Sequence, residues 1–515
     1  MPVDWRRAQP IDSPSTAHRP ADPAHLDGAG GTVPVTRHRP ARKASILLTF
    51  TADALRSLPG PDWLVRRRQE AFDDFLSMPL PSEKEELWRY TPIDDLDLDR
   101  YRPAASGSPA GDHPEAGSPT RSFAGAFLEG MAADLPERSV LVVVRNGLVR
   151  AVTTDGAGGL PEGLAVRGLA GGDAGPGVLG SLLDGGDALM RLNDAFHPDA
   201  VLVEVAAGAV LAAPVVVVHW CDGDGPSGAG RSDGEPGSAT APATFPRTAC
   251  HLARGAQASL VEVVAGAPGT SAALVVPVTE MVVDEGARLD HVALQVLGRG
   301  SWHLARLVAR VGGDGSLRSF TAGLGAAYDR TRTDAAIVGR GGSTELRSAY
   351  FGSGEQVHDV RTLQDHEAPH TTSDLLCKGA VAGSSRSVYS GLIRVRKGAV
   401  RTEAMQTNHN LVLDERAHAD SVPNLDIEEN DVRCSHASTV GPVDEDQRYY
   451  LESRGVPPER AERLIVLGFF DDIVQRAPVR GAVPRLRQEV GTRLAEALGI
   501  DDQLLGSADG GDGDG

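Results

Sequence analysis

Residues 200–440 carry a series of short apolar runs that follow one another with no helical segment of ten or more residues between them. Within these runs Val, Leu and Ile alternate with polar residues at a period of two, which indicates β-strands with one buried face. A doubly wound sheet needs helices at its crossovers, so the pattern argues against that fold. A solenoid of stacked β-turns or a β-sandwich remains.

The corners between the runs favour the solenoid. Similar corners of Gly and other small residues recur at 206–210, 253–256, 284–289 and 396–400. Gly supplies the positive φ that a tight corner needs. Aromatic residues make up only 4% of the chain, which fits a narrow core filled by Val, Leu, Ile and Ala. Residues 222–240 are polar and predict an insertion loop between two strands.

Helical patterns lie on both sides of this β region. Apolar and charged residues interleave at helical spacing over 61–78, and 83–92 continues a helical pattern as far as a proline. An Asn-Gly pair after residues 141–144 predicts a hairpin. Three C-terminal helices are expected, namely 445–453 capped by Asp444, about 457–475, and about 483–498.

These patterns divide the chain into five parts. The first and last are poor in apolar periodicity and predict disorder. The predicted parts are a leader (1–44), an N-terminal helical region (45–135), a β-helix core (136–442), a C-terminal helical region (443–505) and an acidic tail (506–515).

Charge and lysine usage exclude several functions. The net charge of -19 is opposite to the basic surface that nucleic acids and anionic membranes require. No apolar run approaches the roughly 20 residues of a membrane span. A Walker loop needs Gly-Lys followed by Ser or Thr, but the residues after the four lysines are Ala44, Glu85, Gly379 and Gly398. The chain is therefore not a P-loop ATPase, and any ATP dependence must come from a partner.

The four cysteines are scattered and form no CxxC motif, which argues against a zinc ribbon, a thioredoxin motif or a ferredoxin cluster. No apolar stretch follows the first arginines, so we expect no secretory signal. Arginine far outnumbers lysine, a bias associated with high-GC bacterial genomes. These features predict a reduced protein of the bacterial cytoplasm.

Two catalytic motifs occur in unsuitable surroundings. The GxGxxG at 223–228 lies in the polar insertion, contains a proline and opens no helix, so it does not indicate dinucleotide binding. His366 and His370 form an HExxH, but Pro369 would break the helix that a zincin needs. The residues around this motif predict strand and turn instead.

Histidines are concentrated near the end of the β region. In a solenoid such residues can form ladders, so a metal site is one interpretation, and hydrogen-bonded histidines on strand faces are the more ordinary one. Cys434 and His436, two residues apart, would share one face of a strand and could bind iron or a softer metal. A lone Cys is more often a small apolar residue. The histidines are His358, His366, His370, His409, His418 and His436.

Residues 358–474 carry a more specific signal. Its pieces are MQTNHNLVL at 405–413, PNLDI at 423–427, DVRCSHASTVG at 431–441 and QRYYLESRG at 447–455. The stretch resembles the SufB/SufD family of iron-sulfur cluster assembly proteins. The resemblance implies a mainly β fold, a right-handed parallel β-helix flanked by N-terminal and C-terminal α-helical regions.

The resemblance is to the SufD-like branch. Ala417 stands where SufB-like chains carry a sulfur-accepting cysteine. The segment CSHASTVG at 434–441 departs from the SufD-like pattern CSHGATVG at Ala437, in place of Gly, and at Ser438, in place of Ala. It implies a subunit of a SufBCD scaffold with no turnover of its own, which pairs with SufB through the β-helix and docks the SufC ATPase. A homodimer remains open for the isolated chain.

The resemblance also implies sites. His436, and less directly Cys434, would face SufB where a nascent cluster forms, so we expect no stably bound cofactor and a transient iron-sulfur cluster at the interface. The SufC-docking candidates are Tyr449, Tyr450, Arg454, Leu464, Leu467 and Phe469. Two alternatives remain: a SufB-like scaffold that receives sulfur itself, which Ala417 opposes, and a β-helix enzyme acting on polysaccharide, which the low aromatic content opposes.

Overall fold

The chain divides into two units, Met1–Ser45 and Ile46–Gly515. The computed structural model describes residues 49–104, 130, 138–154, 159–170, 177–183, 186–222, 241–266 and 272–498, all within the second unit. The expected leader, nearly all of the polar insertion and the acidic tail lie outside the described residues.

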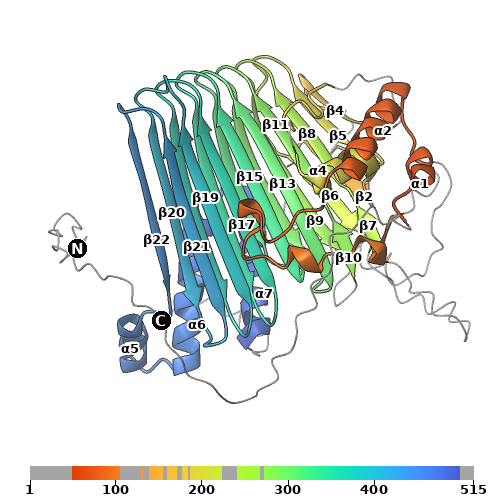
Figure 1. Ribbon diagram of the computed structural model, residues 1–515. Coiled ribbons are helices and arrows are strands. Elements are labelled where there is room, and N and C mark those ends of the chain that lie inside the picture. The colour runs from red at the N-terminus through yellow and green to blue at the C-terminus, as the bar shows by residue number, and fades with distance from the viewer. Residues whose placement is uncertain are drawn as a thin grey trace, which may run out of the picture. The chain divides into compact units, whose positions relative to one another are not determined.

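The second unit is built on a parallel β-solenoid, which confirms the fold predicted from the sequence (Figure 1). Its turns contribute strands alternately to two sheets. Sheet A runs in the order β4 (Leu164–Gly168), β5 (Val201–Val205), β8 (Arg247–Leu252), β11 (Val278–Val283), β13 (Ser301–Val311), β15 (Tyr328–Ile337), β17 (Val357–His366), β19 (Arg386–Val395) and β21 (His418–Ile427). Sheet B runs in the order β3 (Leu148–Thr153), β2 (Val140–Arg145), β6 (Val215–Cys221), β9 (Gln257–Gly266), β12 (Arg288–Val296), β14 (Ser316–Gly323), β16 (Ser343–Gly352), β18 (Thr372–Val381), β20 (Glu403–Val412) and β22 (Arg433–Gly441). Three short strands, β1 (Tyr101–Pro103), β7 (Ala241–Thr244) and β10 (Ala273–Val275), extend sheet A to one side.

Apart from the antiparallel pairs β2/β3 and β4/β5 at the N-terminal end, the strands pair in parallel and residue for residue with the strand one turn further along, as Tyr328 does with Val357 and Val357 with Arg386. Inward side chains therefore stack in columns along the solenoid. The predicted corners make this possible, since Gly208, Gly255 and Gly286 have φ of 72°, 70° and 67°.

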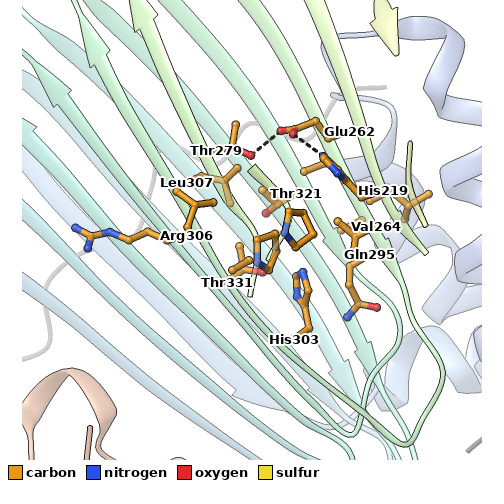
Figure 2. A pocket seen from close by; sticks show the side chains of 17 residues that line it. His219, Glu262, Val264, Thr279, Gln295, His303, Arg306, Leu307, Thr321 and Thr331 are labelled. Carbon is orange, nitrogen blue, oxygen red and sulfur yellow. Dashed lines mark hydrogen bonds and ion pairs between the residues drawn. The ribbon is translucent and has the colours of Figure 1, made fainter. Parts of the chain in front are cut away.

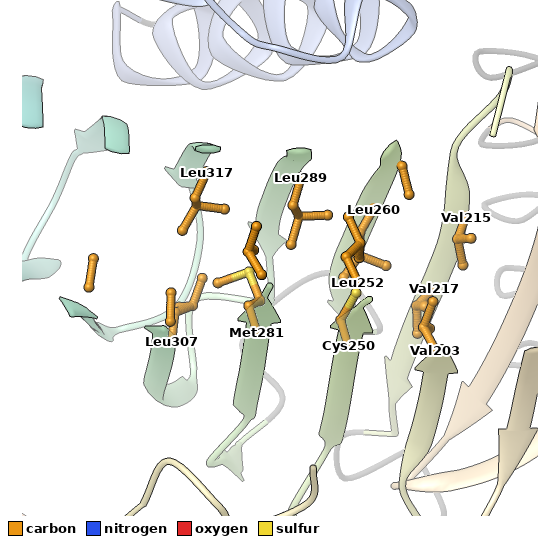
Figure 3. Close-up of a cluster of buried hydrophobic side chains, with 14 of the residues drawn as sticks. Val203, Val215, Val217, Cys250, Leu252, Leu260, Met281, Leu289, Leu307 and Leu317 are labelled. Atoms are coloured by element: carbon orange, nitrogen blue, oxygen red, sulfur yellow. The ribbon is translucent and has the colours of Figure 1, made fainter. Parts of the chain in front are cut away.

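The inside of the solenoid is apolar toward its N-terminal end and increasingly polar beyond it. A cavity of about 40 Å³ lies among its middle turns (Figure 2). The apolar part is filled by residues such as Val217, Leu260 and Leu289 from sheet B against Met281 and Leu307 from sheet A (Figure 3). Burying each such side chain contributes about 1.5–3 kcal/mol.

The N-terminal helices cover the outer face of sheet A. They are α1 (Ala52–Arg56), α2 (Asp62–Ser77) and α4 (Ala188–Phe196), with short 3-10 turns η1 (Glu86–Trp88), η2 (Ile93–Asp95) and η3 (Leu98–Arg100). Phe196 packs edge-on against Phe50 and Phe72 at ring distances of 5.3 and 5.7 Å. The helix predicted over 61–78 is confirmed by α2, and the predicted hairpin by antiparallel β2 and β3.

The expected helical pattern over 83–92 is wrong apart from the single 3-10 turn. Solenoid side chains hold this segment in an irregular path. The Arg330 guanidinium lies 3.7 Å from the Trp88 ring centroid and donates to the Leu87 carbonyl at 2.7 Å. Arg361 donates to the Arg89 carbonyl, also at 2.7 Å. These long-range contacts outweigh local helical propensity.

The C-terminal helices pack on the outer face of sheet B and follow the prediction closely. They are α5 (Glu445–Ser453), α6 (Pro458–Val474) and α7 (Val483–Leu498), with a 3-10 turn η4 (Arg480–Ala482) before α7. The Asp444 side chain caps α5 by accepting from the amides of Asp446 and Gln447. Among the described residues, no helix is long and apolar enough to cross a membrane.

Candidate functional site at the open end of the solenoid

The C-terminal end of the solenoid is uncovered by the residues that the structure describes. Among the described residues β21 pairs only with β19, and β22 pairs only with β20, so both last strands present an unpaired edge. Most residues of β22 are exposed, whereas neighbouring strands within the solenoid are largely buried. Exposed apolar side chains, Leu425, Ile427 and Val440, lie on these two strands. This edge is the part of the solenoid best suited to contact another molecule.

Cys434 and His436 lie on β22 with the same side-chain phase, as their spacing predicts. Cys434 pairs in register with Ala404 and is half-buried against the small apolar cluster of Ile393 and its neighbours. Burial raises the pKa of its thiol, which keeps the unliganded sulfur protonated. His436 pairs in register with Gln406 and is exposed. The imidazole of His436 is therefore accessible to solvent at the open end, and the thiol of Cys434 is less exposed.

The interior next to this pair is polar. Gln406 is 1% exposed, yet neither its amide nitrogen nor its amide oxygen has a hydrogen-bond partner among the described protein atoms. Ser438 donates to Ser421 at 2.7 Å, and Ser421 donates to Oδ1 of Asn408 at 2.9 Å. Asn410 donates to the same oxygen at 2.6 Å. The last turns thus present hydrogen-bonding groups rather than an apolar core to the open end.

A thiol and an imidazole are ligands that iron accepts in proteins. Within the described ranges, no group of three or more His, Cys, Asp or Glu side chains is arranged to hold a metal ion. Cys434 and His436 would therefore complete a coordination sphere only with ligands from elsewhere.

The other histidines of this region are not brought together. His366 is buried between the Thr371 and Ser373 hydroxyls, each 2.8 Å from a ring nitrogen, and burial lowers its pKa to about 4. His370 lies in a turn with φ of 59°, so the HExxH is not helical, as predicted. His358 contacts Asp329. The hydrogen-bonded interpretation therefore holds for His358 and His366.

The remaining two histidines lie near the surface. His409 points to the outer side of β20, where burial and the nearby Lys378 lower its pKa. His418 is exposed at the start of β21, and its Nε2 lies 3.1 Å from Asp420. Neither is close enough to other donor side chains to form a metal-binding group within the described residues.

The six docking candidates fall into two sets. Tyr449, Tyr450 and Leu464 are exposed, and the Arg454 guanidinium lies 5.2 Å from the Tyr450 ring centroid. Leu467 and Phe469 are half-buried in the contact between α6 and sheet B. Phe469 packs 4.6 Å beneath the Lys378 ammonium, which also pairs with Asp472 at 2.7 Å. The first set forms an accessible surface, and the second holds the helix in place.

Sequence reasoning missed the polar interior around the site, above all Gln406 and Asn408. The signal was present, because residues 404, 406, 408 and 410 share one strand phase, and three of them are amides. It also missed Glu262 and Asp329, two buried carboxylates on inward strand positions.

The fold and this edge define a parallel β-solenoid protein with one open end. The family model "SUF system FeS cluster assembly, SufBD core domain" matches residues 236–469. An iron-sulfur cluster assembly SufBD family protein of Mycobacterium tuberculosis is 38% identical over 229 residues, which cover 43% of this chain and 57% of that protein. The iron-sulfur cluster assembly protein SufD of Escherichia coli is 31% identical over 212 residues, 41% of this chain and 50% of that protein.

A SufBD family protein of Synechocystis matches over more of the chain, with 26% identity over 471 residues, 88% of this chain and 94% of that protein. The aligned part of this chain spans little more than half the length, 57%, of the mycobacterial relatives. Residues 236–469 thus carry the SufBD core domain, and the similarity of this part of the chain to SufBD family proteins supports membership of the SufB/SufD family.

Proposed function

We propose that this chain is a SufD-like subunit of a SufBCD iron-sulfur cluster assembly scaffold in the bacterial cytoplasm, with no catalytic turnover of its own. The observation that carries the proposal is the open end of the solenoid, where Cys434 and His436 lie two residues apart on a strand edge that is unpaired among the described residues. A scaffold that builds a cluster between two subunits requires such an incomplete site.

The assignment to the SufD-like side is supported by the position of Ala417. This residue is buried with Val381 and Ala419, so the place where a SufB-like chain carries its sulfur-accepting thiol holds a methyl group in a small apolar cluster. Relatives in Escherichia coli and Bacillus subtilis are themselves named SufD. In this proposal the sulfur acceptor belongs to the partner.

Pairing with a SufB-like subunit would occur through β21 and β22. Their free N–H and C=O groups can continue the ladders into a partner, and Leu425, Ile427 and Val440 supply apolar area for the contact. The nascent cluster, as cargo, would be bound between His436, Cys434 and ligands of the partner, and passed on rather than kept.

Docking of a SufC-like ATPase would use the exposed set on α5 and α6. Tyr449 and Tyr450 are among the most exposed aromatic residues described, and Tyr is enriched at binding hot spots. Since the chain has no Walker lysine, ATP hydrolysis in the complex must belong to the docked partner.

The test is co-expression with candidate SufB and SufC chains, followed by size exclusion and iron and sulfide analysis. We expect His436→Ala to leave the complex intact and to lower the cluster yield at least tenfold. His418→Ala removes an exposed histidine from the adjacent edge strand and is the matched control, expected to keep normal yield. A normal yield from the His436 variant would refute the site, and failure of the wild-type chains to co-purify would refute the complex.

A further inference from the structure

Two carboxylates are buried inside the solenoid, each between two imidazoles. Glu262 on β9 lies 3.1 Å from Nε2 of His291 and 3.6 Å from Nε2 of His219. It also accepts a hydrogen bond of 2.9 Å from Thr279. All four side chains are buried. We refer to Glu262, His219 and His291 as the Glu262 group.

The second group follows further along the solenoid. Oδ1 of Asp329 on β15 lies 2.7 Å from Nδ1 of His303, and its Oδ2 lies 3.2 Å from Nδ1 of His358. The interior is shaped for this carboxylate, because a Cβ at the inward-facing Gly323 would collide with Oδ2. We refer to Asp329, His303 and His358 as the Asp329 group.

Charge balance fixes the number of protons in each group. Neither carboxylate forms an ion pair with Lys or Arg among the described residues. An uncompensated charge is strongly disfavoured in a low-dielectric interior. An ionised carboxylate with two neutral imidazoles has a charge of -1. Each group is therefore neutral only when it binds one additional proton, shared among the carboxylate and the two rings. Burial opposes ionisation of both carboxyls, but hydrogen bonds from the imidazoles outweigh it and hold their pKa values well below the usual range.

The two groups face the cavity of about 40 Å³ in the middle turns (Figure 2). His219 and Glu262 line it from sheet B and His303 from sheet A. Nδ1 of His219 and Nε2 of His303 are buried and have no hydrogen-bond partner among the described protein atoms. Buried polar nitrogens need partners, and a cavity of this size holds roughly three water molecules.

We propose that this cavity is an internal water site, in which ordered water joins His219 to His303. The Glu262 group and the Asp329 group each bind one exchangeable proton. Ordered water can form a hydrogen bond with Nδ1 of His219 and with Nε2 of His303, so both buried nitrogens gain a partner while each group keeps its own proton and stays neutral. The ligand is water rather than a metal, because no metal-holding group of three donors exists in the described part of the chain.

Neighbouring ionisable groups do not supply the missing charge. Burial raises the pKa of the Cys250 thiol beside Glu262, which keeps it neutral. Arg306 lines the cavity but pairs with Asp334 at 3.0 Å. The Tyr350 ring stacks on His358 at 5.8 Å, and burial raises its hydroxyl pKa. That hydroxyl donates to Asn410, so polar side chains continue from the Asp329 group to the open end. The proposed water site does not depend on which molecule binds at the open end.

Neutron diffraction from perdeuterated crystals of the wild-type chain tests both parts of the proposal, the ordered water and the number of protons in each group. We expect ordered water within hydrogen-bond distance of Nε2 of His303, and one extra deuteron on the carboxylate or the rings of each group. A dry cavity would refute the water site. A group with an ionised carboxylate and two neutral rings would refute the proton count.

A matched pair of variants keeps the proton count testable in solution. Asp329→Asn removes the charge of one group, so ¹⁵N NMR of labelled histidines should show His303 and His358 neutral at pH 8 while His219 and His291 are unchanged. Asp426→Asn, at a surface carboxylate on β21 that pairs with Arg394, should change none of the four rings. A charged ring at His303 or His358 in the Asp329→Asn variant would contradict the proposal. If a variant fails to fold, the neutron diffraction experiment on the wild-type chain still tests it.

Discussion

The two ends of the solenoid are built from the same kind of strand and finished in opposite ways. At the N-terminal end the sheets close with antiparallel strands, β3 against β2 and β4 against β5, and the adjoining strands are buried. At the C-terminal end the described residues leave the parallel edges of β21 and β22 unpaired and most side chains of β22 exposed. A parallel turn can be continued by another parallel turn, whereas an antiparallel strand ends the series.

The difference extends into the interior. The N-terminal turns are filled by Val and Leu, and the last turns by Gln406, Asn408 and Asn410. Apolar filling stabilises the fold, and polar filling that reaches an open edge offers groups to a ligand or partner. We therefore expect mutations in the first turns to act on stability, and mutations in the last turns to act on binding.

The largest expected effect is at the covered end. Phe196 is 1% exposed and packs against Phe50, Phe72 and Phe245. Phe196→Ala should lower the free energy of unfolding by about 3–5 kcal/mol, through lost burial and the cavity that remains. Urea unfolding followed by circular dichroism measures this. A loss below about 1 kcal/mol would mean that the aromatic cluster does not support the first turns.

Acid should act on the middle turns. Burial lowers the pKa of His366 to about 4, whereas an unfolded histidine has a pKa of about 6.5. The unfolded chain then binds more protons between these values, so stability falls as pH drops from about 6.5 to 4, by about 3 kcal/mol in all. His366→Gln should flatten this part of the pH profile of urea unfolding. His418→Gln, at an exposed histidine, should not.

A charge on the open edge should affect pairing more than folding. Leu425→Asp on β21 should leave the unfolding midpoint of the isolated chain nearly unchanged and weaken binding to a SufB-like partner at least tenfold, about 1.4 kcal/mol. Val152, exposed to a similar extent on the antiparallel strand β3, provides the control. Equal loss of binding for Val152→Asp, measured by calorimetry, would show that the two edges do not differ as proposed.

The smallest effect on this chain is expected on α5. Tyr449 is 74% exposed, so Tyr449→Ala should change the free energy of unfolding by no more than about 0.5 kcal/mol. Capture of a SufC-like ATPase on immobilised protein should nevertheless fall. Leu76→Ala on α2, also at an exposed apolar residue, should leave capture unchanged. Unaltered capture by the Tyr449 variant would remove this residue from the docking surface.

The sequence was sufficient to predict those features that depend on neighbouring residues alone, namely corners, helix caps and the face of a strand on which a side chain lies. The glycine corners have the positive φ that was expected, and Asp444 caps α5 through two neighbouring amides. The position of Cys434 and His436 on one face of a strand followed from their spacing alone.

What the sequence could not provide depends on register. The Glu262 and Asp329 groups join residues from successive turns, and their contacts exist only once the strands are aligned. The path of residues 83–92 is likewise set by Arg330 and Arg361, far away in the sequence. Helix α4 was missed because it is short and its residues are almost all buried, so no polar face marks it.

The unpaired edge of β21 and β22 also bears on how the protein is made in a cell. Such an edge, with Leu425 and Ile427 exposed beside it, can template any extended peptide of matching pattern, including the same edge of a second copy. If this edge pairs with a SufB-like subunit as proposed, newly synthesised chains in excess of that subunit should self-associate or be degraded. Balanced synthesis of the two proteins would then be needed to prevent aggregation, in addition to its role in activity.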